Sequence, residues 1–155
     1  MTHFTLALDL GTTTGFCIGR AEGNTISSTW DLKPGRFDGG GMRFVRFRQR
    51  LDELHRTMPI GQVHFEEVRA HKGVSAAHIY GGLMATLQAW CEEQTPAVPY
   101  AGVPVGTIKS FATGKGNAGK DAVIAAVRSW GFEPIDDNEA DAIALWRLVV
   151  SGGAR

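Results

Sequence analysis

The sequence is poor in the residues that stabilise secreted or zinc-binding proteins. It contains two cysteines, Cys17 and Cys91, and five histidines in 155 residues. One cysteine lies in a predicted strand and the other near the end of a predicted helix, so we expect both to be reduced packing residues rather than a disulfide framework. With scattered histidines and so few cysteines, the sequence favours neither a disulfide scaffold nor a structural zinc site.

The sequence also lacks a long apolar segment. No apolar run reaches the roughly 18 residues that a membrane span requires, and no basic segment followed by an apolar one begins the chain. We therefore expect a cytoplasmic protein without a membrane partner. A length of 155 residues fits one domain, residues 1–155, whose single core buries about two thirds of the unfolded surface.

Net charge is also absent, and this alone argues against a nucleic-acid partner. The charges are unevenly placed, however, because five of the 16 acids fall within residues 133–141. When those five acids, Asp9 and Glu66 are all excluded, nine acids remain against 16 bases. If the excluded acids bind divalent cations, the surface that a polyanion meets is basic. The alternative is that residues 136–139 are only the solvated start of a helix.

A near-continuous apolar run, FTLALD at residues 4–9, ends in one carboxylate and is followed by a Gly/Thr turn. Such a run is typical of a central strand that is covered on both faces. An unpaired carboxylate there costs several kcal/mol, so Asp9 should be close to neutral or face a cation. The alternative is a turn-initiating Asp at a hairpin, satisfied by the backbone amides of the turn.

Periodicity and turn residues predict an α/β fold with a mixed five-stranded sheet covered by helices on both faces. Short turns make the first three strands antiparallel, and helical crossovers make the fourth and fifth parallel to the first. Pro99 favours an edge position for the fifth strand. Ser75 is a candidate helix cap, and Gly81 with Gly82 suggests close approach of another backbone. The expected strands after the first are 16–20, 25–32, 62–68 and 98–103, and the expected helices are 42–58, 75–93, 107–113, 121–130 and 138–150.

Acidic residues fall where two parallel strands end. If the first and fourth strands are neighbours, Asp9 and Glu66 lie side by side at the carboxyl edge, where ligands bind in such sheets. In DDNEADA at the last helix, Asp137 or Asn138 shares a helix face with Asp141. Oxygen ligands without Cys or His suit Mg²⁺ or Mn²⁺. Two ions about 3.5 to 4 Å apart could then activate a water and stabilise the leaving oxygen of a phosphodiester.

Several neighbouring acids have structural explanations. Glu67 points to the opposite side of its strand from Glu66. Asp136 and Glu139 have capping-box spacing, and Asp137 or Asn138 could also be the N-cap. Asp141 precedes an apolar run and is the hardest acid to explain structurally.

Two basic segments could contact phosphate. In the first, glycines of GKGNAGK at 114–120 would let backbone amides approach an anion while lysines supply charge, although a solvated flexible loop is the alternative. The second has six bases against one acid between Lys33 and Arg50. It could bind a DNA arm with salt-dependent affinity, or form a solvated helix face.

Four pieces of sequence, in this order, resemble a RuvC-type Holliday junction resolvase of the RNase H-like superfamily, with a phage or prophage form as one interpretation. They are LALDLGTTTGFCI, FEEV, IKSFATGKGNAGK and NEADAIAL, and they span nearly the whole chain. The resemblance implies a homodimeric, Mg²⁺-dependent endonuclease for DNA recombination and repair that nicks opposing strands of a four-way junction, leaving 5′-phosphate ends. It also implies metal ligation by Asp9, Glu66 and Asp141, and backbone contacts by Lys109 and Lys120, with Lys115 between them.

This chain departs from the family pattern at two places. An Asp or His usually stands three residues before the last Asp, where this chain has Asn138. Either the amide oxygen of Asn138 coordinates, or Asp137 replaces it, and a carboxylate is the stronger Mg²⁺ ligand. The family also tends to carry a base-wedging aromatic after the FEEV segment. Here Arg69 stands in that place, followed by His71 and Lys72, and Arg69 could instead stack or bind phosphate.

Three other functions fit parts of the sequence. A nuclease of the same superfamily could act on RNA or flap DNA. The DLGTTTG segment also resembles the phosphate loop of sugar kinases and actin-like ATPases, which need a second lobe that a chain of 155 residues is too short to contain. A non-catalytic junction-binding module would follow if Asn138 breaks the metal site.

Overall fold

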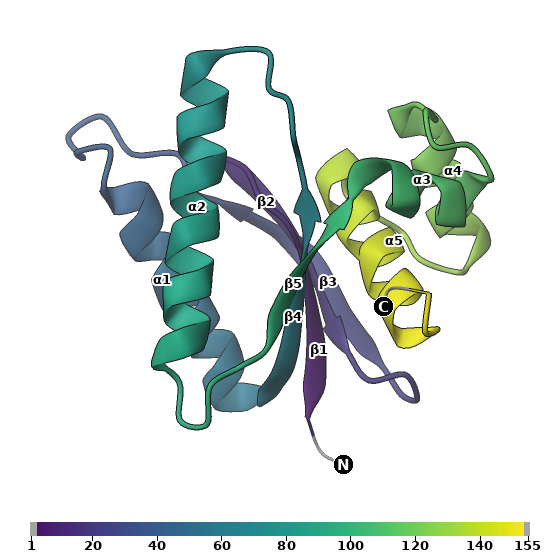
Figure 1. Ribbon diagram of the computed structural model, residues 1–155, viewed down its shortest axis with the longest axis horizontal. Coiled ribbons are helices and arrows are strands. Elements are labelled where there is room, and N and C mark those ends of the chain that lie inside the picture. Colours follow the sequence, from purple (N-terminus) through teal and green to yellow (C-terminus); the bar gives the residue numbers. More distant parts are fainter. Residues whose placement is uncertain (1–2, 154–155) are drawn as a thin grey trace.

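The computed structural model describes residues 3–153, and within this range the chain forms five strands and five helices (Figure 1). The strands are β1 (Phe4–Asp9), β2 (Thr13–Gly19), β3 (Thr25–Asp31), β4 (Ile60–Glu67) and β5 (Tyr100–Pro104). The helices are α1 (Met42–Thr57), α2 (Val74–Glu93), α3 (Val105–Thr113), α4 (Lys120–Ser129) and α5 (Asp137–Val150). Within the described range, none of these helices is both long and apolar enough to span a membrane.

The strands form one mixed sheet in the order β3-β2-β1-β4-β5. The pairs β1–β2 and β2–β3 are antiparallel, and the pairs β1–β4 and β4–β5 are parallel. This confirms the predicted fold class and the predicted neighbourhood of the first and fourth strands. Strand β5 lies at the edge, as Pro99 suggested, and the carbonyl of Pro99 accepts a hydrogen bond from the Val63 amide.

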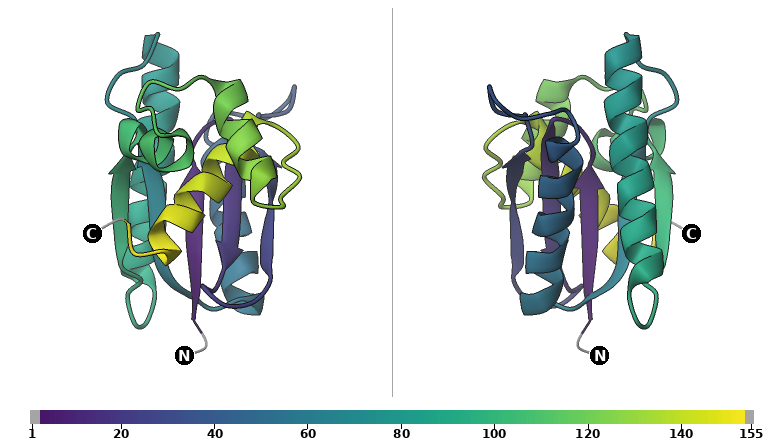
Figure 2. Two further views of the ribbon diagram at one scale, coloured as in Figure 1. Left: turned by 90° about the vertical axis from the view of Figure 1, so that its right-hand side faces the viewer. Right: turned by 90° about the vertical axis from the view of Figure 1, so that its left-hand side faces the viewer.

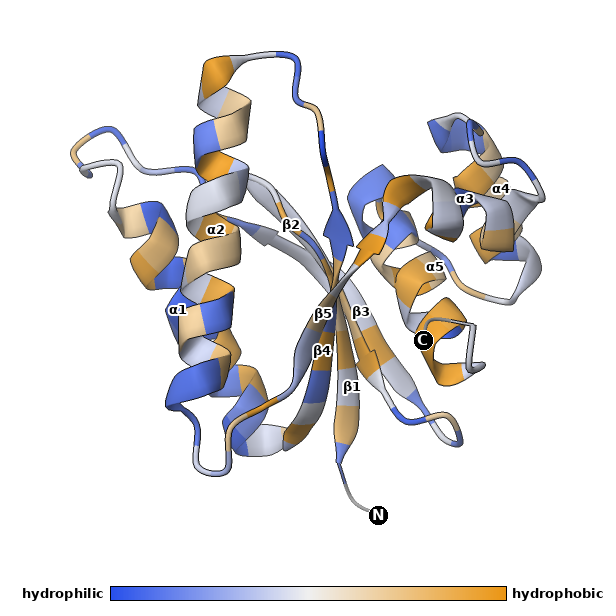
Figure 3. Ribbon diagram, viewed as in Figure 1, coloured by the Kyte–Doolittle hydropathy of each residue, from blue (hydrophilic) through white to orange (hydrophobic). Residues whose placement is uncertain are grey.

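Helices cover both faces of the sheet, with α1 and α2 on one side and α3, α4 and α5 on the other (Figures 1 and 2). Residues of β1 alternate between the two layers. Leu6 and Leu8 pack with the α1 and α2 layer, whereas Ala7 packs with α5. The α5 layer includes the small residues Ala140, Ala142 and Ala144, which let this helix lie close to the sheet. Figure 3 shows that α5 is hydrophilic where it begins and largely hydrophobic beyond that point.

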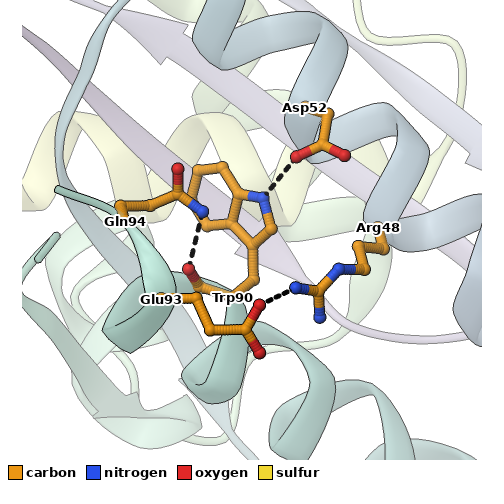
Figure 4. Close-up of polar contacts among 5 residues, drawn as sticks. All are labelled: Arg48, Asp52, Trp90, Glu93 and Gln94. Carbon is orange, nitrogen blue, oxygen red and sulfur yellow. Dashed lines mark hydrogen bonds and ion pairs between the residues drawn. The ribbon is translucent and has the colours of Figure 1, made fainter.

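Polar contacts fix α1 against α2 (Figure 4). The indole Nε1 of Trp90, a fully buried residue, donates to Asp52 Oδ1 at 2.8 Å. Gln94 Nε2 donates to the Trp90 carbonyl at 2.8 Å, and Arg48 pairs with Glu93. The buried tryptophan therefore has its one donor satisfied, as a buried indole requires.

Three local predictions are wrong. Ser75 is not a cap, because α2 begins at Val74 and its N-cap is Gly73, which has no side chain to accept a hydrogen bond. The close neighbour of Gly82 is the ring of Phe44 rather than another backbone, and the Cβ position of Gly81 is open. The second strand begins at Thr13 instead of Phe16, because its pairing with β3 extends into the Gly/Thr segment. Cys17 and Cys91 are free and buried, as predicted.

Candidate metal and active site

The parallel pairing of β1 and β4 brings two acids together at the carboxyl edge. In the register, Leu8 lies opposite Phe65, so Asp9 and Glu66 follow at the next positions of the two strands. Alternation along β1 turns Asp9 toward the same face as Ala7, which is the face that α5 covers. The side chain of Asp9 therefore leaves the sheet toward the start of α5.

Helix α5 supplies the third acid because its first turn lies very close to β2. A Cβ added at Gly15 would stand 2.0 Å from the Asn138 carbonyl oxygen. Only glycine fits there without displacing the backbone of α5. Asp141 follows one turn into the helix, so its position over the sheet edge depends on this approach.

We expect Gly15→Ala to lower the melting temperature and to weaken divalent-metal binding, because the added methyl group pushes the start of α5 away from the sheet. Overpacking of this kind typically costs about 1 to 3 kcal/mol. Calorimetric melting and Mg²⁺ titration measure the two effects. Gly40→Ala is the matched control, because the Cβ position of Gly40 has no neighbour within 4 Å. Unchanged metal affinity in the Gly15→Ala variant would contradict this account of α5.

The side chains of Asp9, Glu66 and Asp141 converge. Each offers a carboxylate oxygen, and the three oxygens lie within 4.8 Å of one another. Ligand oxygens on an octahedral Mg²⁺ lie about 2.9 to 4.2 Å apart, since each is about 2.0 to 2.1 Å from the ion. Small side-chain adjustments would therefore close the group on one ion. The donor set is all carboxylate oxygen, which suits Mg²⁺ or Mn²⁺, so the cluster could hold a metal ion.

Burial and mutual repulsion keep these carboxyl groups from ionising together. Burial, then the charges of Glu66 and Asp141, raise the pKa of Asp9 well above its ordinary value. Burial, then the charges of Glu66 and Asp137, raise the pKa of Asp141 to about 7. Burial raises the pKa of Glu66 too, against the opposing effects of a hydrogen bond with Asp9 and the Lys109 charge. A bound cation is the partner that would let all three ionise at neutral pH.

The turn after Asp9 is organised by a buried threonine that the sequence interpretation did not single out. Thr14 is fully buried, and its hydroxyl donates to the Gly11 carbonyl at 2.7 Å. The same hydroxyl accepts from the Gly11 amide at 3.4 Å. This turn amide is therefore directed to Thr14 and does not pair with the Asp9 carboxylate.

Tyr80 supports Glu66 from the other face of the sheet. Its hydroxyl donates to the Glu66 carbonyl at 2.8 Å and accepts from the Val68 amide at 3.1 Å. This pair of bonds fixes the end of β4 against α2. Sequence analysis missed Tyr80, and its only signal was a hydroxyl on an otherwise apolar helix face.

The two candidates for a fourth ligand lie beside the cluster and have other partners. Asp137 is in the first turn of α5, and its Oδ2 lies 3.3 Å from Lys120 Nζ. The side-chain amide of Asn138 donates to Asp136 Oδ2 at 3.5 Å. Asp137 does not belong to the group of three converging acids.

Asp136, rather than Asp137 or Asn138, is the N-cap of α5. Its Oδ1 accepts from the Glu139 amide at 2.9 Å. Glu139 is buried, and its Oε2 accepts from the Ile135 amide at 2.6 Å, while Oε1 accepts from the Ser27 hydroxyl at 3.3 Å. The capping-box spacing therefore identified two structural acids correctly, and the expectation that Asp137 or Asn138 caps the helix is wrong.

Two of the three predicted phosphate-binding lysines, Lys109 and Lys120, lie near the acidic cluster. Lys109 on α3 is close enough to lower the pKa values of Glu66 and Asp141. Lys120 begins α4 and pairs with Asp137, whereas Lys115 is exposed in the loop between the two helices. The side chains of Lys109 and Lys120 thus stand near the acids, and no contact places Lys115 there.

The segment after β4 is exposed and carries the other predicted contacts. Arg69 Nε lies 3.2 Å from Glu67 Oε1, on the side of the strand opposite to Glu66. The Arg69 side chain is 77% exposed and keeps guanidinium donors available. Lys72 is exposed as well, and the ring of His71 lies 4.9 Å from that of Tyr80.

No protein-family model and no curated protein sequence matches this chain. Solved structures do match it. Thermus thermophilus RuvC in complex with a Holliday junction substrate aligns with a TM-score of 0.80 and 21% identity, over 99% of this chain and 98% of that one. Another Thermus thermophilus RuvC structure gives 0.72 and 23% identity over 98% of each chain. The yeast mitochondrial Holliday junction resolvase gives 0.61 and 14% identity over 98% of this chain and 79% of that one. The chain therefore has the RNase H-like fold of the RuvC-type Holliday junction resolvases.

Proposed function

We propose that this protein is a divalent-metal-dependent endonuclease that resolves four-way DNA junctions by paired, symmetric nicks. The observation that carries the proposal is the convergence of Asp9, Glu66 and Asp141, whose ligand oxygens lie within 4.8 Å of one another. They converge at the carboxyl edge of a sheet whose fold matches a RuvC that was solved with a Holliday junction substrate.

The residues at this edge suit phosphodiester hydrolysis. Mg²⁺ or Mn²⁺ held by the three carboxylates would lower the pKa of a bound water and neutralise charge that develops on the phosphate. Lys109 and Lys120 would place ammonium groups on the phosphate oxygens and so orient the scissile bond. Attack of water on phosphorus with departure of the 3′ oxygen would leave 5′-phosphate and 3′-hydroxyl ends.

Asp137 is the stronger candidate for a fourth ligand, because a carboxylate binds Mg²⁺ better than an amide does. It would have to exchange its ion pair with Lys120 for the metal, which would release the lysine for the phosphate. The amide of Asn138 contacts the capping residue Asp136 and has less freedom to turn toward the site.

Substitution separates these candidates. We expect Asp137→Ala to lower the Mg²⁺-dependent cleavage rate by at least about tenfold, the effect typical of losing a supporting group at a metal site. We expect Asn138→Ala to change it by less than about threefold. Single-turnover cleavage across a Mg²⁺ titration measures both, with Glu133→Gln, an exposed acid before α5, as the control. If neither substitution changes the rate, a four-ligand site is refuted.

The experiment that tests the function compares labelled four-way junction, linear duplex, flap and RNA/DNA hybrid side by side, with Mg²⁺, with Mn²⁺ and with EDTA. We expect metal-dependent cleavage of the junction only, at positions related by its symmetry. Preferential cutting of hybrid or flap would replace the proposal with the RNA or flap nuclease. Tight junction binding without cleavage would indicate a binding module.

Paired nicking requires two copies of the site, whereas residues 3–153 of one chain contain one such acidic cluster. We therefore propose a homodimer on the junction. Sedimentation of the protein alone and with junction DNA measures this, and two protomers per junction are expected. A single protomer that cuts both strands sequentially would contradict the paired mechanism.

A further inference from the structure

The loop between β3 and α1 presents an aromatic ring to solvent. Phe37 is 94% exposed, more than Ile135 at 72% or Val74 at 71%. Single exposed apolar side chains are common on protein surfaces, so exposure alone indicates nothing. The organisation of this loop gives the ring its significance.

Hydrogen bonds fix the loop although its composition, with Pro34 and several glycines, predicts flexibility. Asp38 Oδ2 accepts from the Gly35 amide at 2.7 Å, and the Asp38 amide donates to the Gly35 carbonyl at 3.0 Å. Arg46 on α1 lies 2.7 Å from the same carboxylate. Phe37 is therefore held away from the protein at a turn that is tied to α1, and a partner would not have to order the loop.

The surroundings of the ring are cationic. The Arg36 guanidinium carbon lies 5.5 Å from the Phe37 ring centroid. The one acid of the loop, Asp38, already pairs with Arg46. Among residues 3–153, Lys33, Arg36 and Arg43 form no ion pair, whereas the other three bases between Lys33 and Arg50 each do. An anionic partner with a flat apolar face matches this combination.

The loop also lies at the end of the molecule that carries the acidic cluster. In Figure 1 it stands at the same end of the molecule as the close of β4 and the start of α5. Both views of Figure 2 show the loop at this end, on the side of α1 that faces away from α2. A branched nucleic acid whose scissile phosphate lies at the acids can therefore extend an arm toward this loop.

We propose that Arg36 and Phe37 form a base-stacking contact for the DNA substrate, in which the ring stacks on an unpaired or opened nucleobase and the guanidinium binds the adjacent phosphate. The proposal rests on the proposed nuclease function and names the substrate feature that this surface reads. Stacking of this kind is tolerant of sequence, because every base offers a flat face. The loop thus distinguishes DNA with unstacked bases from continuous duplex.

Binding in a cleavage-blocked background tests the proposal. All variants carry Asp9→Asn and are titrated with a four-way junction that has 2-aminopurine beside the crossover, and with a linear duplex of the same sequence. We expect Phe37→Ala to weaken junction binding about tenfold and to abolish the 2-aminopurine fluorescence change, with less than a twofold effect on duplex. Phe37→Trp should retain both signals.

Ile26→Ala is the matched control, since Ile26 is 52% exposed on the edge strand β3. Equal affinities of the Phe37→Ala and Ile26→Ala variants for the junction would overturn the proposal. So would an equal loss on duplex and junction, or a shift from dimer to monomer in sedimentation, which would make the loop an interface between copies.

The two proposals fail in distinguishable ways. Cleavage of the junction by the unmodified protein tests the nuclease function without reference to Phe37. If the protein cuts junctions and Phe37→Ala binds them normally, only the stacking contact is wrong. If no substrate is cut while Phe37 still governs binding to unstacked DNA, the nuclease function is wrong and the contact stands.

Discussion

Asp9→Asn should abolish metal-dependent junction cleavage, with a rate loss of at least about a thousandfold, while junction binding stays within about twofold of the unmodified protein. The rate falls because metal-assisted charge stabilisation supplies several kcal/mol and each 1.4 kcal/mol is tenfold. Binding survives because the substitution leaves unchanged the lysines near the site and the bases between Lys33 and Arg50. Single-turnover cleavage and fluorescence anisotropy measure the two quantities.

Glu133→Gln is the control for this experiment, because it removes an exposed acid that stands outside the cluster. It should cleave at the unmodified rate. A thermal melt of both variants establishes that they are folded. Loss of binding in parallel with cleavage in a folded Asp9→Asn protein would show that Asp9 acts on the DNA contact instead of on the metal.

The second large effect is on stability, which should fall as pH rises when no metal is bound. Burial raises the folded-state pKa of Asp141 from 3.8 to about 7, whereas the unfolded chain keeps the ordinary value. The unfolded state thus releases its proton first, and stability present below about pH 4 is lost as pH rises toward about 7. The raised pKa of Asp9 acts in the same direction.

In EDTA we expect the metal-free protein to lose on the order of 2 to 4 kcal/mol between pH 4 and pH 8 through these acids. This corresponds to a drop in melting temperature of roughly 5 °C or more for a chain of this size. Saturating Mg²⁺ at pH 8 should restore much of the loss, since a ligand that binds only the folded state stabilises it.

Asp141→Asn should flatten this dependence and raise the melting temperature in EDTA at pH 8, because the amide carries no charge to bury. It should also remove most of the stabilisation by Mg²⁺. Calorimetric melts from pH 4 to pH 8, with EDTA and with Mg²⁺, measure all of these effects. A metal-free protein that is more stable at pH 8 than at pH 5, with no change on substitution, would contradict the buried acidic cluster.

The sheet could be predicted because its signals are local. The apolar run ending in Asp9 identified a central strand, and Pro99 identified the edge. The convergence of Asp9 and Glu66 followed from strand order alone, since parallel neighbours end at one edge. The start of α2 at Val74 could not be predicted from the sequence. Its N-cap is Gly73, which has no side chain and so leaves no capping signal.

The candidate site was predictable only in part. The spacing of Asp136 and Glu139 indicated a capping box; Asp136 caps the helix, and Glu139 accepts from the amide of Ile135, one residue before the cap. The same spacing rules could not choose between Asp137 and Asn138, because the outcome depends on which neighbour each side chain finds, Lys120 or Asp136. Tyr80 and Thr14 act through single hydroxyl contacts across the fold, which no pattern along the chain reveals.

The placement of the three converging acids has a consequence for biosynthesis. Within residues 3–153, Asp9 lies on the first strand, and Asp141 lies on α5, the last helix of this range to be synthesised. A nascent chain that has not yet delivered α5 holds two repelling carboxyl groups and lacks the third acid of the cluster. Partly translated chains and proteolytic fragments without this helix should therefore be unable to cut nucleic acid, so that any nuclease activity begins only when folding is complete.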